Sequence, residues 1–126
     1  MNNKKTQRNS KEKDIKERSF SFACRIVKLY QFLARKRGGG EVLGRQVLRS
    51  GTSIGANLEE ASAGQSKADF IFKCNIALKE ARETYYWLRL LMTTRIVPVS
   101  RLRQLANESN ELVAILTTIV KKSRSR

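Results

Sequence analysis

Basic side chains spaced along one early stretch of the chain could bind phosphate. A helical wheel places five of them on one side of residues 15–37: Arg18, Arg25, Lys28, Arg35 and Lys36. Together with Arg37 they could follow a nucleic-acid backbone, because guanidinium and ammonium groups neutralise phosphate charge. A solvated helix surface explains the same spacing, so the pattern alone leaves both interpretations open.

The overall charge favours a polyanionic partner. The chain has 26 Lys and Arg against 11 Asp and Glu, a net charge of +15 over 126 residues. The excess lies in residues 1–40, with 12 basic and 3 acidic side chains, and in residues 121–126, with 4 and none. We expect RNA or DNA as the partner, with Lys121 and Lys122 adding phosphate contacts. An anionic membrane surface, or charge that only maintains solubility, are the alternatives.

The residues that commonly carry catalysis are scarce. Histidine is absent, and Cys24 and Cys74 lie fifty positions apart in apolar runs, where we expect both to be buried and unpaired. Four carboxylates fall on two expected helices: Glu59, Glu60, Glu80 and Glu83. Ion pairs with Arg49, Lys79, Arg82 or Arg89 explain them more simply than an active site does. The sequence therefore predicts no enzyme, no metal site and no cofactor.

Four amphipathic helices must position these side chains. We expect them at residues 15–37, 41–64, 67–95 and 100–121, separated by the Gly38–Gly40 run, by a start at the N-cap residue Ser66, and by Pro98. Short loops between long helices favour antiparallel neighbours, which predicts an all-α, up-down-up-down four-helix bundle. Residues 1–14 and 122–126 have little to bury, and we expect flexible basic tails there.

Small residues interrupt the second expected helix. Gly51 and Gly55 lie one turn apart, so a neighbouring helix could pack close to the backbone there. A phosphate-binding loop is the competing interpretation, but this run has neither the G-x-x-x-x-G-K-[ST] spacing nor a preceding strand.

Large apolar side chains surround almost the whole circumference near the end of the third expected helix. One neighbouring pair of helices cannot cover them all, so we expect an oligomer interface. The residues expected in it are Phe32, Tyr86, Trp87 and Leu91. Stacking of these aromatic rings on nucleic-acid bases is the alternative. No apolar run is long enough to span a membrane or to form a signal peptide, so we expect a cytoplasmic location.

Two separated motifs add a family resemblance. The run QVLRSGTSIGANLEEA at residues 46–61, followed by KADF at 67–70 and IALKEARETYYWL at 76–88, resembles the four-helix-bundle proteins encoded within ribosomal RNA intervening sequences. The resemblance covers roughly residues 20–120. A related branch comprises the accessory variability determinants of diversity-generating retroelements, which are pentameric barrels whose basic surface engages a reverse transcriptase and its template RNA.

The resemblance implies a ring-like homopentamer with a basic surface and no active site. It also implies a reverse transcriptase as a possible protein partner. The central motif is more similar to the intervening-sequence branch, whereas the high basicity suits the retroelement branch. We therefore expect a non-enzymatic accessory protein that binds nucleic acid. The alternative is an oligomeric scaffold that binds protein and has no direct role with nucleic acid.

Overall fold

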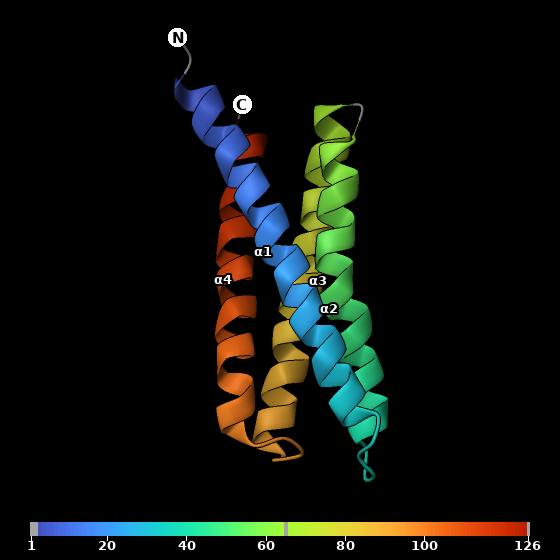
Figure 1. Ribbon diagram of the computed structural model, residues 1–126. Helices are drawn as coiled ribbons and strands as arrows, with labels where there is room; N and C mark the ends of the chain where they lie inside the picture. Colours follow the sequence, from blue (N-terminus) through green and yellow to red (C-terminus); the bar gives the residue numbers. More distant parts are fainter. Residues whose placement is uncertain (1–2, 65, 126) are drawn as a thin grey trace.

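The computed structural model describes residues 3–64 and 66–125, with side chains described from Asp14 onward, and these residues form a four-helix bundle. Its helices are α1 (Asn3–Leu33), α2 (Gly40–Ser62), α3 (Lys67–Thr93) and α4 (Val99–Arg124). Consecutive helices run antiparallel, and α1 crosses the front of the bundle at a tilt (Figure 1). The all-α, up-down-up-down bundle predicted from the sequence is confirmed.

The helix ends differ from those expected. Helix α1 includes residues 3–14, and α4 continues to Arg124, so most of both expected tails is helical. Residues 1, 2 and 126 lie outside the described residues. The polar residues of these segments are largely Lys, Arg, Gln and Glu, which favour helix even without an apolar face. At its other end α1 stops at Leu33, four residues before the expected end at Arg37. After Leu33 the chain forms a turn in which Lys36 N donates a hydrogen bond to Leu33 O at 2.9 Å.

The caps of the helices follow from local sequence. Gly38 and Gly39 have φ values of 78° and 100°, which an L side chain rarely adopts, so the glycine run forms the α1–α2 loop as expected, although α1 itself ends earlier, at Leu33. Ser66 caps α3 by accepting a hydrogen bond from Asp69 N at 3.1 Å, as predicted.

The expected apolar faces form the core. Buried side chains recur along α1 at steps of seven, four, three and four, and they are Ile15, Phe22, Ile26, Leu29 and Leu33. On α4 the corresponding residues are Leu102, Leu105, Leu112 and Leu116. Cys74 is buried on α3, but Cys24 is exposed, contrary to its expected burial. Cys24 precedes Arg25 on the outer side of α1, two positions from the buried Phe22 and Ile26.

Glycines bring α2 close to α1. A Cβ atom added at Gly51 would lie 2.8 Å from Cγ2 and 2.9 Å from Cγ1 of Ile26, closer than real Cβ contacts. At Gly44 it would lie 3.1 Å from Leu33 Cβ. The close packing expected at the small residues of the second helix is therefore present, and α1 is the helix that approaches.

Within the described residues, no helix is long and apolar enough to cross a membrane.

The α1–α2 contact yields a prediction about Gly51→Ala. The new methyl group would overlap Ile26, and overpacking of this kind costs about 1–3 kcal/mol, which exceeds the gain of about 0.5–1 kcal/mol from replacing a helical glycine. We expect the free energy of unfolding, measured by urea denaturation and circular dichroism, to fall.

Gly55→Ala is the matched control, because its Cβ would lie 3.5 Å from Ser19 Oγ, an ordinary contact. We expect this substitution to leave stability unchanged or raise it. In an Ile26→Ala background the penalty of Gly51→Ala should disappear. Equal effects of the two glycine substitutions would contradict the close-packing argument.

Candidate nucleic-acid interface

The basic side chains predicted on the first helix fall into two groups. Arg25 and Lys28 lie one turn apart on the exposed side of α1. Because α1 ends at Leu33, the basic run Arg35–Arg37 lies in the α1–α2 loop instead of continuing the helical stripe. All five side chains are exposed, and none forms an ion pair with a carboxylate of the described residues.

Arg18 has a different role from the other predicted phosphate contacts. Its guanidinium donates to Glu108 through Nε at 3.1 Å and through Nη2 at 2.5 Å, and Nη2 also donates to Glu111 Oε2 at 2.5 Å. These hydrogen bonds, to Glu108 first and then to Glu111, raise the pKa of Arg18 above its ordinary value. Arg18 thus joins α1 to α4, and its donors are already committed to carboxylates. This geometry conflicts with its predicted role as a phosphate contact.

Two cationic side chains from different parts of the chain lie against the ring of Phe32. Lys36 Nζ lies 4.8 Å from the centre of its ring, and Arg101 Cζ lies 5.2 Å from the same point. Lys36 belongs to the α1–α2 loop and Arg101 to the first turn of α4. These contacts, with distances in the range of cation–π interactions, show that the two segments meet at one end of the bundle.

We call this part of the molecule the loop end and define it as residues 34–45 and 93–103. The α1–α2 and α3–α4 loops lie at the same end of the bundle, at the bottom of Figure 1. The loop end contains seven basic residues and one acidic residue, Glu41, which already pairs with Arg45 at 2.8 Å. Its other basic residues are exposed: Arg35, Lys36, Arg37, Arg95, Arg101 and Arg103.

The sequence interpretation missed Arg95, Arg101 and Arg103. They fall in a region whose charges nearly balance along the chain, so a count by segments does not single them out. An up-down bundle places its first and third loops at the same end, and combining that topology with the charges of both loops could have found them.

Lys121 and Lys122 lie at the opposite end of the bundle from Arg35–Arg37 (Figure 1). Both are exposed near the end of α4. The α2–α3 loop shares this end, and there Glu59 pairs with Lys16 at 3.5 Å while Glu60 pairs with Lys73 at 2.5 Å. The predicted phosphate contacts therefore do not form one continuous surface.

The residues expected at an oligomer interface also separate. Tyr86 is 54% exposed, whereas Phe32 and Trp87 are half-buried. Leu91 is fully buried in the core, so its expected position on an outer surface is wrong. Leu91 lies seven residues after the buried Thr84 on α3. It therefore points in the same direction, toward the other helices. On the surface Phe20 and Phe72 are more exposed than Tyr86, at 69% and 62%.

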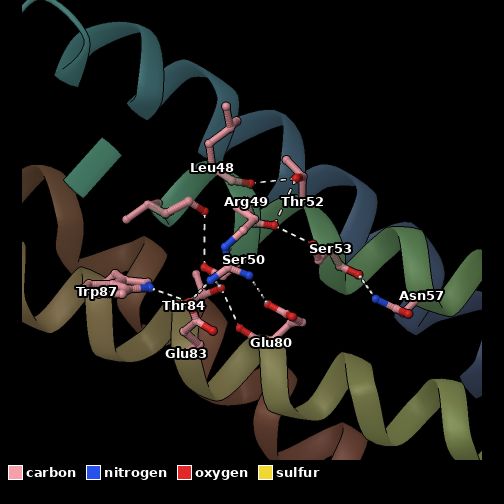
Figure 2. Close-up of polar contacts among 11 residues, drawn as sticks. Leu48, Arg49, Ser50, Thr52, Ser53, Asn57, Glu80, Glu83, Thr84 and Trp87 are labelled. Carbon is pink, nitrogen blue, oxygen red and sulfur yellow. Dashed lines mark hydrogen bonds and ion pairs between the residues drawn. The ribbon is translucent and has the colours of Figure 1, made fainter. Parts of the chain in front are cut away.

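The carboxylates of α3 are engaged in contacts between helices (Figure 2). Arg49 of α2 donates to Glu80 at 3.4 Å and also pairs with Glu83, which in turn accepts from Trp87 Nε1 at 2.9 Å. Beneath them the buried Thr84 hydroxyl donates to Ser50 Oγ at 2.9 Å. The prediction that ion pairs occupy these carboxylates is confirmed, although Glu59 and Glu60 pair with lysines that we did not name. These polar groups hold α2 and α3 in register.

Comparison with known proteins gives two matches. The family described as 23S rRNA-intervening sequence protein matches residues 11–118. Among solved structures, a protein with unknown function from the S23 ribosomal protein family of Bacteroides thetaiotaomicron is similar, with 49% sequence identity and a TM-score of 0.83. That match covers 88% of this chain and 98% of the other. No curated protein matches the chain. The family resemblance seen in the two sequence motifs is confirmed.

The Arg18 contacts yield a stability prediction. Arg18→Met keeps the aliphatic length but removes the donors to both glutamates, so we expect the free energy of unfolding to fall by about 1 kcal/mol. The matched control is Arg45→Met, which removes an exposed pair within one helix and should cost about 0.5 kcal/mol or less. Urea denaturation measures both changes. An equal effect would mean that Arg18 does not hold α1 against α4.

Proposed function

Because the chain belongs to the 23S rRNA-intervening sequence protein family, we propose that it is a non-enzymatic, basic accessory protein that binds nucleic acid through phosphate contacts as part of a homo-oligomer. The observation that carries this proposal is that most carboxylates of the described residues are already occupied in ion pairs, which leaves many cations without an acidic partner. Five basic side chains pair with seven carboxylates of the described residues, and Arg18 and Arg49 each take two.

The cations that remain cannot be neutralised within the chain. Residues 14–125 contain 20 basic and 10 acidic side chains, a net charge of +10. The exposed Arg25, Lys28 and Arg35–Arg37 are among those without a carboxylate partner in the described part of the chain. A net charge of this size destabilises a compact protein by self-repulsion, and binding a polyanion offsets that repulsion. Phosphate groups at regular spacing along RNA or DNA supply the required charge density.

Exposed apolar side chains support self-assembly. Phe20 on α1 and Phe72 and Tyr86 on α3 are each more than half exposed. Burial of such side chains against another copy would remove apolar surface from water, which stabilises association. The subunit number of five rests on the family resemblance.

A second candidate is a scaffold that binds protein, and the same exposed apolar residues favour it. A reverse transcriptase is the partner that the resemblance implies. Pull-down from a lysate treated with nuclease separates the candidates. A protein partner that persists supports the scaffold, and one that is lost was bridged by nucleic acid.

The nucleic-acid proposal predicts a steep dependence on salt. The logarithm of the affinity for a single-stranded RNA should fall linearly with the logarithm of salt concentration, with a slope of about −0.7 for each phosphate contacted. Removing two contacts in Arg25→Ala/Lys28→Ala should make the slope shallower by about 1.4 per protomer that contacts the RNA. Fluorescence anisotropy across a salt series measures this.

The control is Lys16→Ala/Lys73→Ala, which removes the same charge from two residues that pair with carboxylates. This control variant should make the salt slope shallower by less than Arg25→Ala/Lys28→Ala does. A wild-type protein whose weak binding is independent of salt would refute the proposal.

The self-assembly proposal predicts a mass of about five times 14.4 kDa in light scattering. Tyr86→Ser removes an exposed apolar ring and should shift the protein toward smaller species, because less apolar surface is buried on association. Tyr86→Phe keeps the ring and should preserve the assembly. A wild-type monomer at all concentrations would contradict the proposal, as would equal behaviour of the two variants.

A further inference from the structure

We propose that the loop end is the principal contact surface for the phosphodiester backbone, and that Lys36 and Arg101, which both lie against the ring of Phe32, contribute phosphate contacts to it. This inference rests on the proposed nucleic-acid function and states where on the bundle that function resides. It joins Arg35–Arg37, which the sequence singles out, to three arginines that the fold places at the same end of the bundle: Arg95, Arg101 and Arg103.

The first argument is the geometry at Phe32. Lys36 Nζ and Arg101 Cζ lie 4.8 and 5.2 Å from the centre of one ring, so the two charged groups are at most 10.0 Å apart, the sum of these distances. Neither group has a carboxylate partner among the described residues. Phosphates of a strand that binds here would offset the repulsion between these like charges with attractions to each of them. The ring holds the two cations and supplies no competing anion.

The second argument is the charge around this pair. Arg35, Arg37, Arg95 and Arg103 are exposed in the same two loop segments, and Glu41 is already neutralised by Arg45. A phosphate chain that approaches the loop end therefore meets no free carboxylate of the described residues there. The opposite end has more carboxylates, because Glu59, Glu60 and Asp69 flank the α2–α3 loop, although Glu59 and Glu60 pair with lysines.

The third argument is that short hydrogen-bonded turns fix both loops. Lys36 N donates to Leu33 O at 2.9 Å, and Arg101 N donates to Pro98 O at 3.0 Å. Arg95 N donates to Met92 O at 3.2 Å, and Arg95 itself has a φ of 59°, a conformation that favours glycine. An arginine thus stands where the backbone favours a residue without a side chain. A loop backbone that is fixed in advance loses less conformational freedom on binding.

The chemistry points to recognition of the backbone without selection of a sequence. The ring of Phe32 already carries two cations, so it is not free to stack on a base. No other aromatic residue lies within residues 34–45 or 93–103. Phosphate contacts position a strand but carry no direct sequence information. RNA and DNA single strands of equal length should therefore bind similarly.

The experiment compares the two ends of the bundle in the full-length protein. Arg95→Gly/Arg101→Ala/Arg103→Ala removes three positive charges from the loop end, and glycine at position 95 suits the backbone there. Lys121→Ala/Lys122→Ala/Arg124→Ala removes the same charge from the opposite end. Fluorescence anisotropy with a labelled 20-nucleotide oligo-U and with oligo-dT measures affinity at several salt concentrations, and circular dichroism checks that each variant is folded.

We expect the loop-end variant to bind at least about tenfold more weakly, with a slope shallower by about two, and the opposite-end variant to lose less than about threefold. Equal losses, or a larger loss at the opposite end, would overturn the inference while leaving the nucleic-acid function intact. A wild-type protein that binds neither strand at low salt would instead refute the proposed function itself.

Protection from chemical labelling gives a second readout that needs no variant. An amine-reactive acetylating reagent, followed by mass spectrometry, reports the accessibility of individual lysines with and without oligo-U. We expect the strand to protect Lys36 more than Lys121 and Lys122. Protection of the C-terminal lysines with Lys36 left reactive would overturn the inference.

Discussion

The close contact between α1 and α2 decides how the rest of the bundle is arranged. Because Gly51 has no side chain, Ile26 can lie almost against the backbone of α2. Gly44, seven residues earlier on α2, lets Leu33 approach the backbone in the same way. This contact fixes the last turns of α1, which carry Phe32 toward α4. The tilt of α1 across the bundle (Figure 1) and the meeting of Phe32 with Arg101 both depend on it.

The arginines show why charge alone does not identify a binding residue. Arg18 and Arg25 lie seven positions apart on one helix, where spacing gives them the same direction. Yet Arg18 finds Glu108 and Glu111, ninety and more positions away, whereas no described carboxylate reaches Arg25. The tertiary structure separates them because α1 is tilted across the bundle, and only Arg18 lies where it can reach the carboxylates of α4 (Figure 1). Arg49 is a parallel case on α2, held by Glu80 and Glu83.

Periodicity was sufficient to predict the elements and most of the core. The steps from Ile15 to Leu33 specify one buried face, and Ser66 with Asp69 specifies a helix start, because both signals are local. Signals that depend on neighbours were weaker. Leu91 and Tyr86 both lie in an apolar run, and only the packing of the other helices shows that one is core and the other surface. The prediction that Cys24 is buried was wrong for the same reason, since apolar neighbours in the sequence do not ensure burial in the folded structure.

The loop end could be predicted in part. Arg35–Arg37 follow a glycine run and therefore belong to a loop on any helical interpretation, but their neighbours Arg101 and Arg103 come from sixty or more residues later. Their proximity follows from topology.

The distribution of charge has a physical logic that links stability to function. Six carboxylates form ion pairs that bridge neighbouring helices, and pairs such as Arg18 with Glu108 help to hold those helices together. Arg25, Lys28 and the basic residues of the loop end other than Arg45 are exposed on helix surfaces and in loops, where water screens their mutual repulsion most effectively. The bundle can therefore keep a large net charge with little loss of stability, and the same charges remain accessible to a polyanion. A comparable excess placed between the helices would have destabilised the core and been hidden from any partner.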